Sequence, residues 1–131
     1  MSFLTGLLCA MSSGQRNSSL GAYGERVAVQ RLVGQGMVLV DRNWRCELGE
    51  VDLVLRDGAV LVFCEVKTRS SAAYGHPLEA VTPEKGERLR QLALRWVEEH
   101  GVDPPEIRVD LVGVLLAERG AAEVEHVQGV G

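Results

Sequence analysis

The sequence predicts an α/β (α+β) domain in which a mixed sheet is flanked by helices. A tight-turn signal at Asp57-Gly58 lies between two alternating apolar runs, which indicates a β-hairpin over residues 49–69. Apolar residues recur at helical spacing over residues 19–33 and again after Thr82-Pro83, a capping hydroxyl followed by a first-turn proline. Two further apolar runs predict the remaining strands, at residues 37–45 and 107–116. The predicted order is helix, strand, strand, strand, helix, strand.

The length of 131 residues suits one domain with its own hydrophobic core. We expect a flexible tail over residues 1–19, the folded domain over 20–116 and a C-terminal extension over 117–131, which forms either a short edge strand or a tail. The apolar run from Phe3 to Ala10 is too short to span a membrane and lacks the basic flank of a signal peptide. A tail is therefore expected there, and a cleaved leader is the alternative.

The formal net charge of −4 argues against a uniformly basic nucleic-acid-binding surface. The charge is uneven, because residues 96–131 hold eight of the 18 acidic residues and two of the 14 basic ones. The charge of the whole chain therefore does not exclude a basic face elsewhere. The three cysteines lack metal-binding spacing, so we expect reduced thiols in a cytoplasmic protein with no membrane partner.

The hairpin is expected to place its charged residues on one face. A two-residue turn at Asp57-Gly58 would set residue 54 opposite 61, residue 52 opposite 63, and residue 50 opposite 65. One face would then carry Glu50, Asp52, Phe63, Glu65 and Lys67. The other would be a core face of Val51, Leu53, Leu55, Val60, Val62, Cys64 and Val66.

Carboxylates so close together oppose folding unless a cation lies among them. Mg²⁺ takes oxygen ligands from one or two carboxylates and keeps several waters, so it suits Asp52 and Glu65. Lys67 lies two residues beyond Glu65 on the same predicted face, within reach of a metal-bound group. The alternative is an ordinary solvent-exposed charged face.

The first helix presents small residues to the sheet together with one acid. Gly21, Gly24, Ala28 and Leu32 fall on one stripe, and Glu25 falls on the same stripe. A carboxylate that points inward is costly unless it is paired or bound. Glu25 is therefore either a further acidic group of the metal site or an edge residue paired with an arginine.

Basic and polar residues near this face are candidates for phosphate contact, with solvent exposure as the alternative. Three of them, Arg42, Asn43 and Arg45, end the first strand. Lys85, Arg88 and Arg95 flank the apolar stripe of the second helix, and the loop after the hairpin offers Arg69, Tyr74 and His76. Asp110, within the last strand, is expected to be structural or to lie at an edge rather than to bind a ligand.

The order of elements and charged residues resembles the PD-(D/E)xK nuclease core. Asp52 matches the acidic residue of the second strand, and Glu65-Val66-Lys67 matches the E-x-K of the third. Val51 precedes Asp52, so the P-D dipeptide itself is absent, as it is in many members of that superfamily.

The chain also resembles, more narrowly, the YraN-type family of small bacterial proteins over roughly residues 20–115. Six pieces match in order: G-x-x-G-E from Gly21, R-N-x-R from Arg42, G-E-V-D-L-V from Gly49, L-V-F-C-E-V-K-T-R from Leu61, Y-G-x-P-x-E-A-V from Tyr74 and K-x-x-R-L from Lys85. The resemblance implies a restriction-endonuclease-like core with a mixed sheet of four to five strands, similar to archaeal Holliday-junction resolvases.

The residues and the resemblance together predict an endonuclease, dependent on Mg²⁺ or Mn²⁺, that hydrolyses DNA phosphodiester bonds. Asp52 and Glu65 would bind the metal, with Glu25 and Glu50 assisting, and Lys67 would orient the attacking water. The backbone would be held by Arg42, Asn43, Arg45, Arg69, Tyr74, Lys85 and Arg88. Backbone contacts carry no sequence information, so branched DNA is the expected substrate, and a homodimer would suit it. The alternative is a non-catalytic nucleic-acid-binding or protein-interaction module with the same fold.

Overall fold

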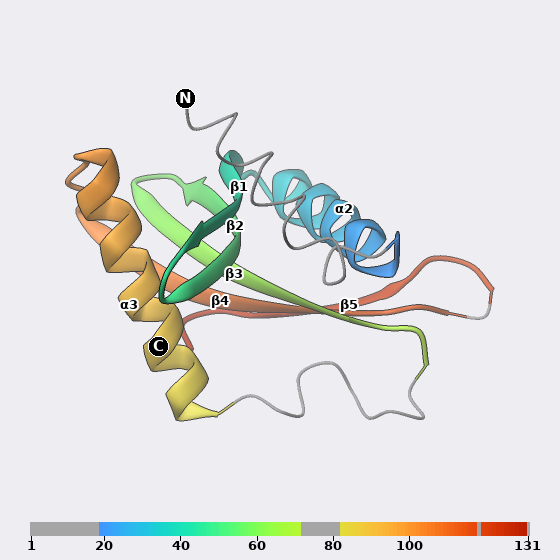
Figure 1. The fold of residues 1–131 in the computed structure, drawn as a ribbon. Helices are drawn as coiled ribbons and strands as arrows, with labels where there is room; N and C mark the ends of the chain where they lie inside the picture. The colour runs from blue at the N-terminus through green and yellow to red at the C-terminus, as the bar shows by residue number, and fades with distance from the viewer. Residues whose placement is uncertain (1–18, 72–81, 118, 131) are drawn as a thin grey trace.

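The computed structural model describes residues 19–71, 82–117 and 119–130, which form a five-stranded mixed sheet with two helices (Figure 1). The helices are α2 (Ser19–Gly34) and α3 (Pro83–His100). The strands are β1 (Val38–Cys46), β2 (Gly49–Asp57), β3 (Val60–Arg69), β4 (Glu106–Leu115) and β5 (Glu123–Val127). The predicted α+β fold and element order are confirmed, and β5 adds a strand from the segment expected as an extension.

The strands lie side by side in their order along the chain, from β1 to β5. The β3–β4 pair is parallel because α3 crosses between these strands, and the other three pairs are antiparallel. None of the described helices is long and apolar enough to cross a membrane.

Helix α3 begins at the predicted Thr82-Pro83 signal and ends before Gly101. The Thr82 hydroxyl accepts the backbone N–H of Lys85 at 3.3 Å, and Pro83 occupies the first turn, where no N–H is needed. At the other end Gly101 has a φ of 63°, the left-handed conformation that closes a helix. Both ends of the helix are thereby capped.

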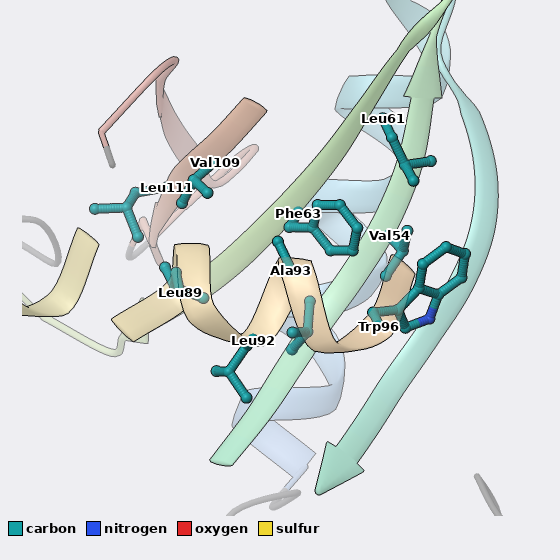
Figure 2. Close-up of a cluster of buried hydrophobic side chains, with 10 residues drawn as sticks. Val54, Leu61, Phe63, Leu89, Leu92, Ala93, Trp96, Val109 and Leu111 are labelled. Carbon is teal, nitrogen blue, oxygen red and sulfur yellow. The ribbon is translucent and has the colours of Figure 1, made fainter. Parts of the chain in front are cut away.

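Both faces of the sheet are buried, one under each helix. One apolar cluster joins α3 to the central strands through Val54, Leu61, Phe63, Leu89, Leu92, Ala93, Trp96, Val109 and Leu111 (Figure 2). The opposite cluster joins α2 to Leu53, Leu55, Val62, Cys64, Val112 and Val114. The hairpin therefore has two core faces, and the prediction of a single core face was wrong, because Phe63 is buried on the face expected to be polar.

The hairpin turn lies one residue later than predicted. Asp57 pairs with Val60, so Gly58 and Ala59 form the turn, and Gly58 has a φ of 62°. Asp57 is kept in the strand by this pairing and by Arg108, whose Nη1 donates to Asp57 Oδ2 at 3.2 Å. The predicted register is consequently wrong by two residues, although a two-residue shift leaves the alternation of faces unchanged.

Asp110 has the structural role that the sequence predicted. Its side chain is fully buried on β4, where Arg108 donates to both carboxylate oxygens at 2.9 and 3.0 Å. His126 Nε2 lies 2.7 Å from Oδ2, and the backbone N–H of Gly129 donates to Oδ1 at 3.1 Å. This carboxylate therefore connects β4 to β5 and to the residues that follow β5.

Candidate functional site

Strands β2 and β3 pair with each other only in the half nearest to their turn, and then they diverge. Their pairing runs from Asp57–Val60 to Leu53–Cys64. Beyond that point, β2 residues 49–51 stay paired with β1, and β3 residues 65–69 stay paired with β4. We call the region between β2 residues 49–52 and β3 residues 65–69 the fork. The predicted direct pairing of Glu50 with Glu65 is wrong, because the strands separate before those positions.

The fork opens into a pocket of about 480 Å³. Because the sheet is interrupted there, side chains from both helices reach the same space although the helices cover opposite faces. The lining residues are Leu20, Gly21 and Glu25 from α2, Gly49, Glu50 and Asp52 from β2, Glu65, Val66, Lys67 and Thr68 from β3, and Lys85, Arg88, Leu89 and Leu92 from α3. All four predicted acidic residues and Lys67 therefore face one pocket.

Asp52 spans the base of the fork. Its Oδ2 accepts the backbone N–H of Val66 at 2.7 Å, a hydrogen bond between the two diverging strands. Burial raises the pKa of Asp52 to about 8, although the Val66 N–H lowers it, and the nearby charges of Glu25, Glu50 and Glu65 raise it further. Without a cation, this carboxyl group is mainly protonated at neutral pH.

Glu50 has a buried oxygen without a partner. Its Oε2 is shielded from solvent and accepts no hydrogen bond from the described residues. Burial raises the pKa of Glu50, and the charge of Arg45 opposes that rise. A buried carboxylate oxygen normally has a donor or a cation beside it, so this atom is one that a ligand could satisfy.

Glu25 is inserted from α2 and is 8% exposed. Burial raises its pKa, the charge of Arg42 and a hydrogen bond from Asn43 oppose the rise, and the charge of Glu50 adds to it. Glu25 was predicted either to join the acidic site or to pair with an arginine. It lines the acidic pocket and also has Arg42 nearby.

The close approach of α2 to the fork depends on Gly24. A Cβ at this position would lie 1.9 Å from Thr68 Oγ1 on β3, a distance that no side chain tolerates. The small-residue stripe signalled close packing of this helix, but not which strand residue it meets. Because Glu25 follows Gly24 directly, the same contact brings its carboxylate to the pocket.

The cationic side of the pocket is formed by Lys67, Lys85 and Arg88. Arg88 is partly engaged, because its Nε and Nη2 donate to the carbonyl oxygen of Leu48 at 3.3 and 3.0 Å. Arg95, on the same helix, pairs with Glu47. Arg88 and Arg95, which were predicted to contact phosphate, therefore connect α3 to the turn between β1 and β2.

The remaining predicted contacts do not line the pocket in the described part of the chain. Arg42 and Asn43 face Glu25, while the charge of Arg45 lowers the pKa of Glu50. Arg69 donates to the carbonyl oxygen of neighbouring Thr68 at 3.4 Å. Tyr74 and His76 lie outside the described residues. The pocket contact that sequence reasoning missed is the Val66 N–H, which has no side-chain signal.

The donor set of the pocket suits a hard divalent cation. Within the described ranges, no three His, Cys, Asp or Glu side chains are arranged as a ready-made metal site. Mg²⁺ requires fewer, because it commonly takes one or two carboxylates and retains several waters. Four acidic residues lining one pocket, with an unpartnered oxygen on Glu50, fit such a cation.

Comparison with known proteins gives a family match over most of the chain. Residues 24–114 match the model of the uncharacterised protein family UPF0102. A UPF0102 protein of Nocardioides sp. is 64% identical over 113 residues, which cover 86% of this chain and 91% of the relative. UPF0102 proteins of Streptomyces coelicolor and Beutenbergia cavernae are each 59% identical, covering 86% of this chain and 88% and 96% of the relatives.

Proposed function

This chain belongs to the uncharacterised protein family UPF0102, and we propose that it is an endonuclease, dependent on Mg²⁺ or Mn²⁺, that hydrolyses DNA phosphodiester bonds. One observation supports this most strongly: four acidic residues and Lys67 line a single pocket in the fork. The unpartnered Oε2 of Glu50 and the raised pKa of Asp52 indicate that this acidic set is incomplete without a cation.

The acidic residues have distinct roles in this proposal. Asp52 and Glu65 are the principal metal ligands, and Glu25 and Glu50 contribute directly or through water. A divalent cation held there would polarise a phosphate oxygen and lower the pKa of its bound water. Because Asp52 is fixed by the Val66 N–H, one of its oxygens remains to face the pocket.

Lys67 orients the attacking water and stabilises the negative charge that develops on the phosphate. Its position among the pocket-lining residues of β3, two residues after Glu65, places an ammonium group beside the acidic set. A lysine suits this role because its three donors can rotate toward a changing oxygen arrangement.

Lys85 and Arg88 contact the DNA backbone from α3, at the side of the pocket opposite α2. Contacts with phosphate position the nucleic acid without reading its bases, so we expect selectivity for branched structure rather than for sequence. Arg42, Arg45, Arg69 and Tyr74 remain candidates for further DNA contacts. Asn43 was also predicted as one, but its amide donates to Glu25.

The test is incubation of purified protein with branched, single-stranded and duplex DNA in Mg²⁺ or Mn²⁺. We expect metal-dependent cleavage that is greatest on branched DNA and is lost in Asp52→Asn and Lys67→Met. Asp103→Asn is the matched control, because Asp103 is exposed and does not line the pocket. Equal cleavage by all four proteins would assign the activity to a contaminant and contradict the proposal.

A non-catalytic module with the same fold makes a different prediction. It would bind DNA with an affinity that falls with salt, because cations are released from the phosphates, and it would cleave none of the substrates. That result in the same experiment would replace the endonuclease by a nucleic-acid-binding protein.

A further inference from the structure

Asn43 has an unusual backbone conformation within β1, shortly after the register shift between Leu39 and Asp41. Its φ is 53°, and among the described residues no other non-glycine residue has a positive φ. The β1–β2 pairing continues on both sides of it, with Arg42 opposite Leu53 and Trp44 opposite Val51. Asparagine tolerates the left-handed region better than most residues, but this conformation still costs energy that the surrounding structure must supply.

The amide of Asn43 is directed at Glu25. With its nitrogen facing the carboxylate, it donates to both Oε1 and Oε2 of Glu25 at 3.2 Å, and the amide orientation is assigned from this fit. Glu25 comes from α2 and is 8% exposed, so a donor from β1 fixes a nearly buried carboxylate across two elements. The charge of Arg42, the neighbouring residue, acts on the same carboxylate.

The location of Asn43 argues against direct contact with DNA. It does not line the pocket, whereas Glu25 does. Its amide is already engaged with Glu25, which leaves it poorly placed to bind a phosphate. Side chains that orient metal ligands commonly lie in this position, one hydrogen bond behind the ligand.

We infer that Asn43 is a positioning residue, which fixes the carboxylate of Glu25 toward the divalent cation, and is not the DNA contact that the sequence suggested. The inference rests on the proposed function, because it assigns Glu25 to that metal site. The strained backbone at Asn43 serves this purpose, since it turns the amide out of the strand alternation and toward α2.

The test combines Asn43→Gly with Glu25→Gln. Glycine accepts a φ of 53° without strain and removes the side chain that donates to Glu25, so the variant should fold. We expect Asn43→Gly to raise about 10-fold the Mn²⁺ concentration that gives half of the maximal rise in Tm, with little change in KM for DNA. In a Glu25→Gln background the same change should have no further effect, whereas in a Glu65→Gln background it should retain its full effect.

Two results would overturn the inference. One is an Asn43→Gly variant whose KM for DNA rises while its Mn²⁺ dependence is unchanged, which would restore the DNA contact. The other is additivity of Asn43→Gly and Glu25→Gln in the thermal stability of metal-free protein, which would show that the two side chains do not interact. The second measurement needs no metal, so it decides the inference even if the native protein binds no Mn²⁺ and the endonuclease proposal fails.

Discussion

The carboxylate of Asp52 accepts the backbone N–H of Val66 at 2.7 Å, at the point where β2 and β3 cease to pair with each other. A side chain thus takes the place of the next strand-to-strand hydrogen bond. The relationship fixes one acidic residue at the base of the fork and keeps its other oxygen available. Burial at this position raises the pKa of Asp52 to about 8, although the Val66 N–H opposes the rise.

Stability of the metal-free protein should fall as pH rises toward 8. Burial raises the pKa of Asp52 to about 8 in the folded chain, so the unfolded chain releases this proton at lower pH than the folded chain does. The stabilising contribution of Asp52 is therefore complete below pH about 4, and it is lost progressively as the pH rises to about 8. Asp52→Asn should remove that dependence, as measured by Tm against pH without metal.

The control for this pH dependence is Asp103→Asn, at an exposed position. It should leave the curve of Tm against pH parallel to that of the native protein. A native Tm that is flat between pH 5 and 8, or an Asp52→Asn curve identical to it, would contradict the raised pKa.

Replacing Gly24 by alanine should destabilise the protein strongly for so small a change. The added Cβ would lie 1.9 Å from Thr68 Oγ1, so α2 must move away from β3. Overpacking of this kind costs about 1–3 kcal/mol in the free energy of unfolding. Because Glu25 moves with the helix, Mn²⁺ affinity should fall as well. Urea unfolding and Mn²⁺ titration measure the two effects.

Gly34→Ala provides the matched control within the same helix. Nothing lies within 4 Å of a Cβ at Gly34, and its backbone is not in the left-handed region. This variant should be neutral or more stable by up to about 1 kcal/mol, with Mn²⁺ affinity unchanged. Equal behaviour of the two alanine variants would show that the Gly24–Thr68 contact does not position α2.

The buried carboxylate of Asp110 should make the protein sensitive to acid. Burial alone would raise its pKa, but hydrogen bonds from His126, Arg108 and the Gly129 N–H outweigh it, and the pKa is lowered. The stability that the ionised group supplies is therefore present at neutral pH and is lost as pH falls through the lowered pKa. Asp110→Asn should cost about 3 kcal/mol at pH 7, because Arg108 loses a buried partner.

Urea unfolding at pH 7 and pH 3 measures this effect. The difference between Asp110→Asn and the native protein should narrow at the lower pH. A variant as stable as the native protein at pH 7 would mean that the contacts of β5 and Gly129 with Asp110 contribute nothing to folding.

Arg88 should be needed for the shape of the pocket as well as for its charge. Its guanidinium donates twice to the Leu48 carbonyl, in the turn that leads to Glu50. Arg88→Lys keeps the charge but loses the paired donors, so it should lower Mn²⁺ affinity while leaving the salt dependence of DNA binding unchanged. Arg90→Lys, on the same helix and outside the pocket, is the control. Unchanged Mn²⁺ affinity in Arg88→Lys would restrict Arg88 to contact with DNA.

Periodicity and caps predicted the elements but not the hairpin register. The turn moved by one residue because Asp57 pairs with Val60 and with Arg108, which is 51 residues away in the chain. No short-range sequence pattern indicates that Arg108 is the partner of Asp57. Asp52, Glu65 and Lys67 still line one pocket, as predicted, but the predicted alternation along β2 fails at Val51. Val51 was expected on the face of Leu53 and instead packs in the opposite cluster with Val54.

The rest of the site depends on contacts that side-chain patterns do not record. The Val66 donor is a backbone group, and Asn43, whose amide donates to Glu25, has a left-handed backbone that its side-chain pattern does not indicate. Arg88 was predicted to contact phosphate, but it donates to the Leu48 carbonyl, 40 residues earlier in the chain. The sequence therefore identified the acidic residues of the pocket better than it identified the residues that contact them.

The most direct measurement of the central claim is thermal melting of the native protein and Asp52→Asn during titration with Mn²⁺ at pH 7. A cation that binds the folded pocket stabilises it by about 2.7 kcal/mol at 100 times its Kd, so the native Tm should rise with concentration and saturate. Asp52→Asn should show a greatly reduced rise, whereas Asp103→Asn should match the native protein. A native Tm that does not respond to Mn²⁺, or an equal response from Asp52→Asn, would contradict a metal site in the fork.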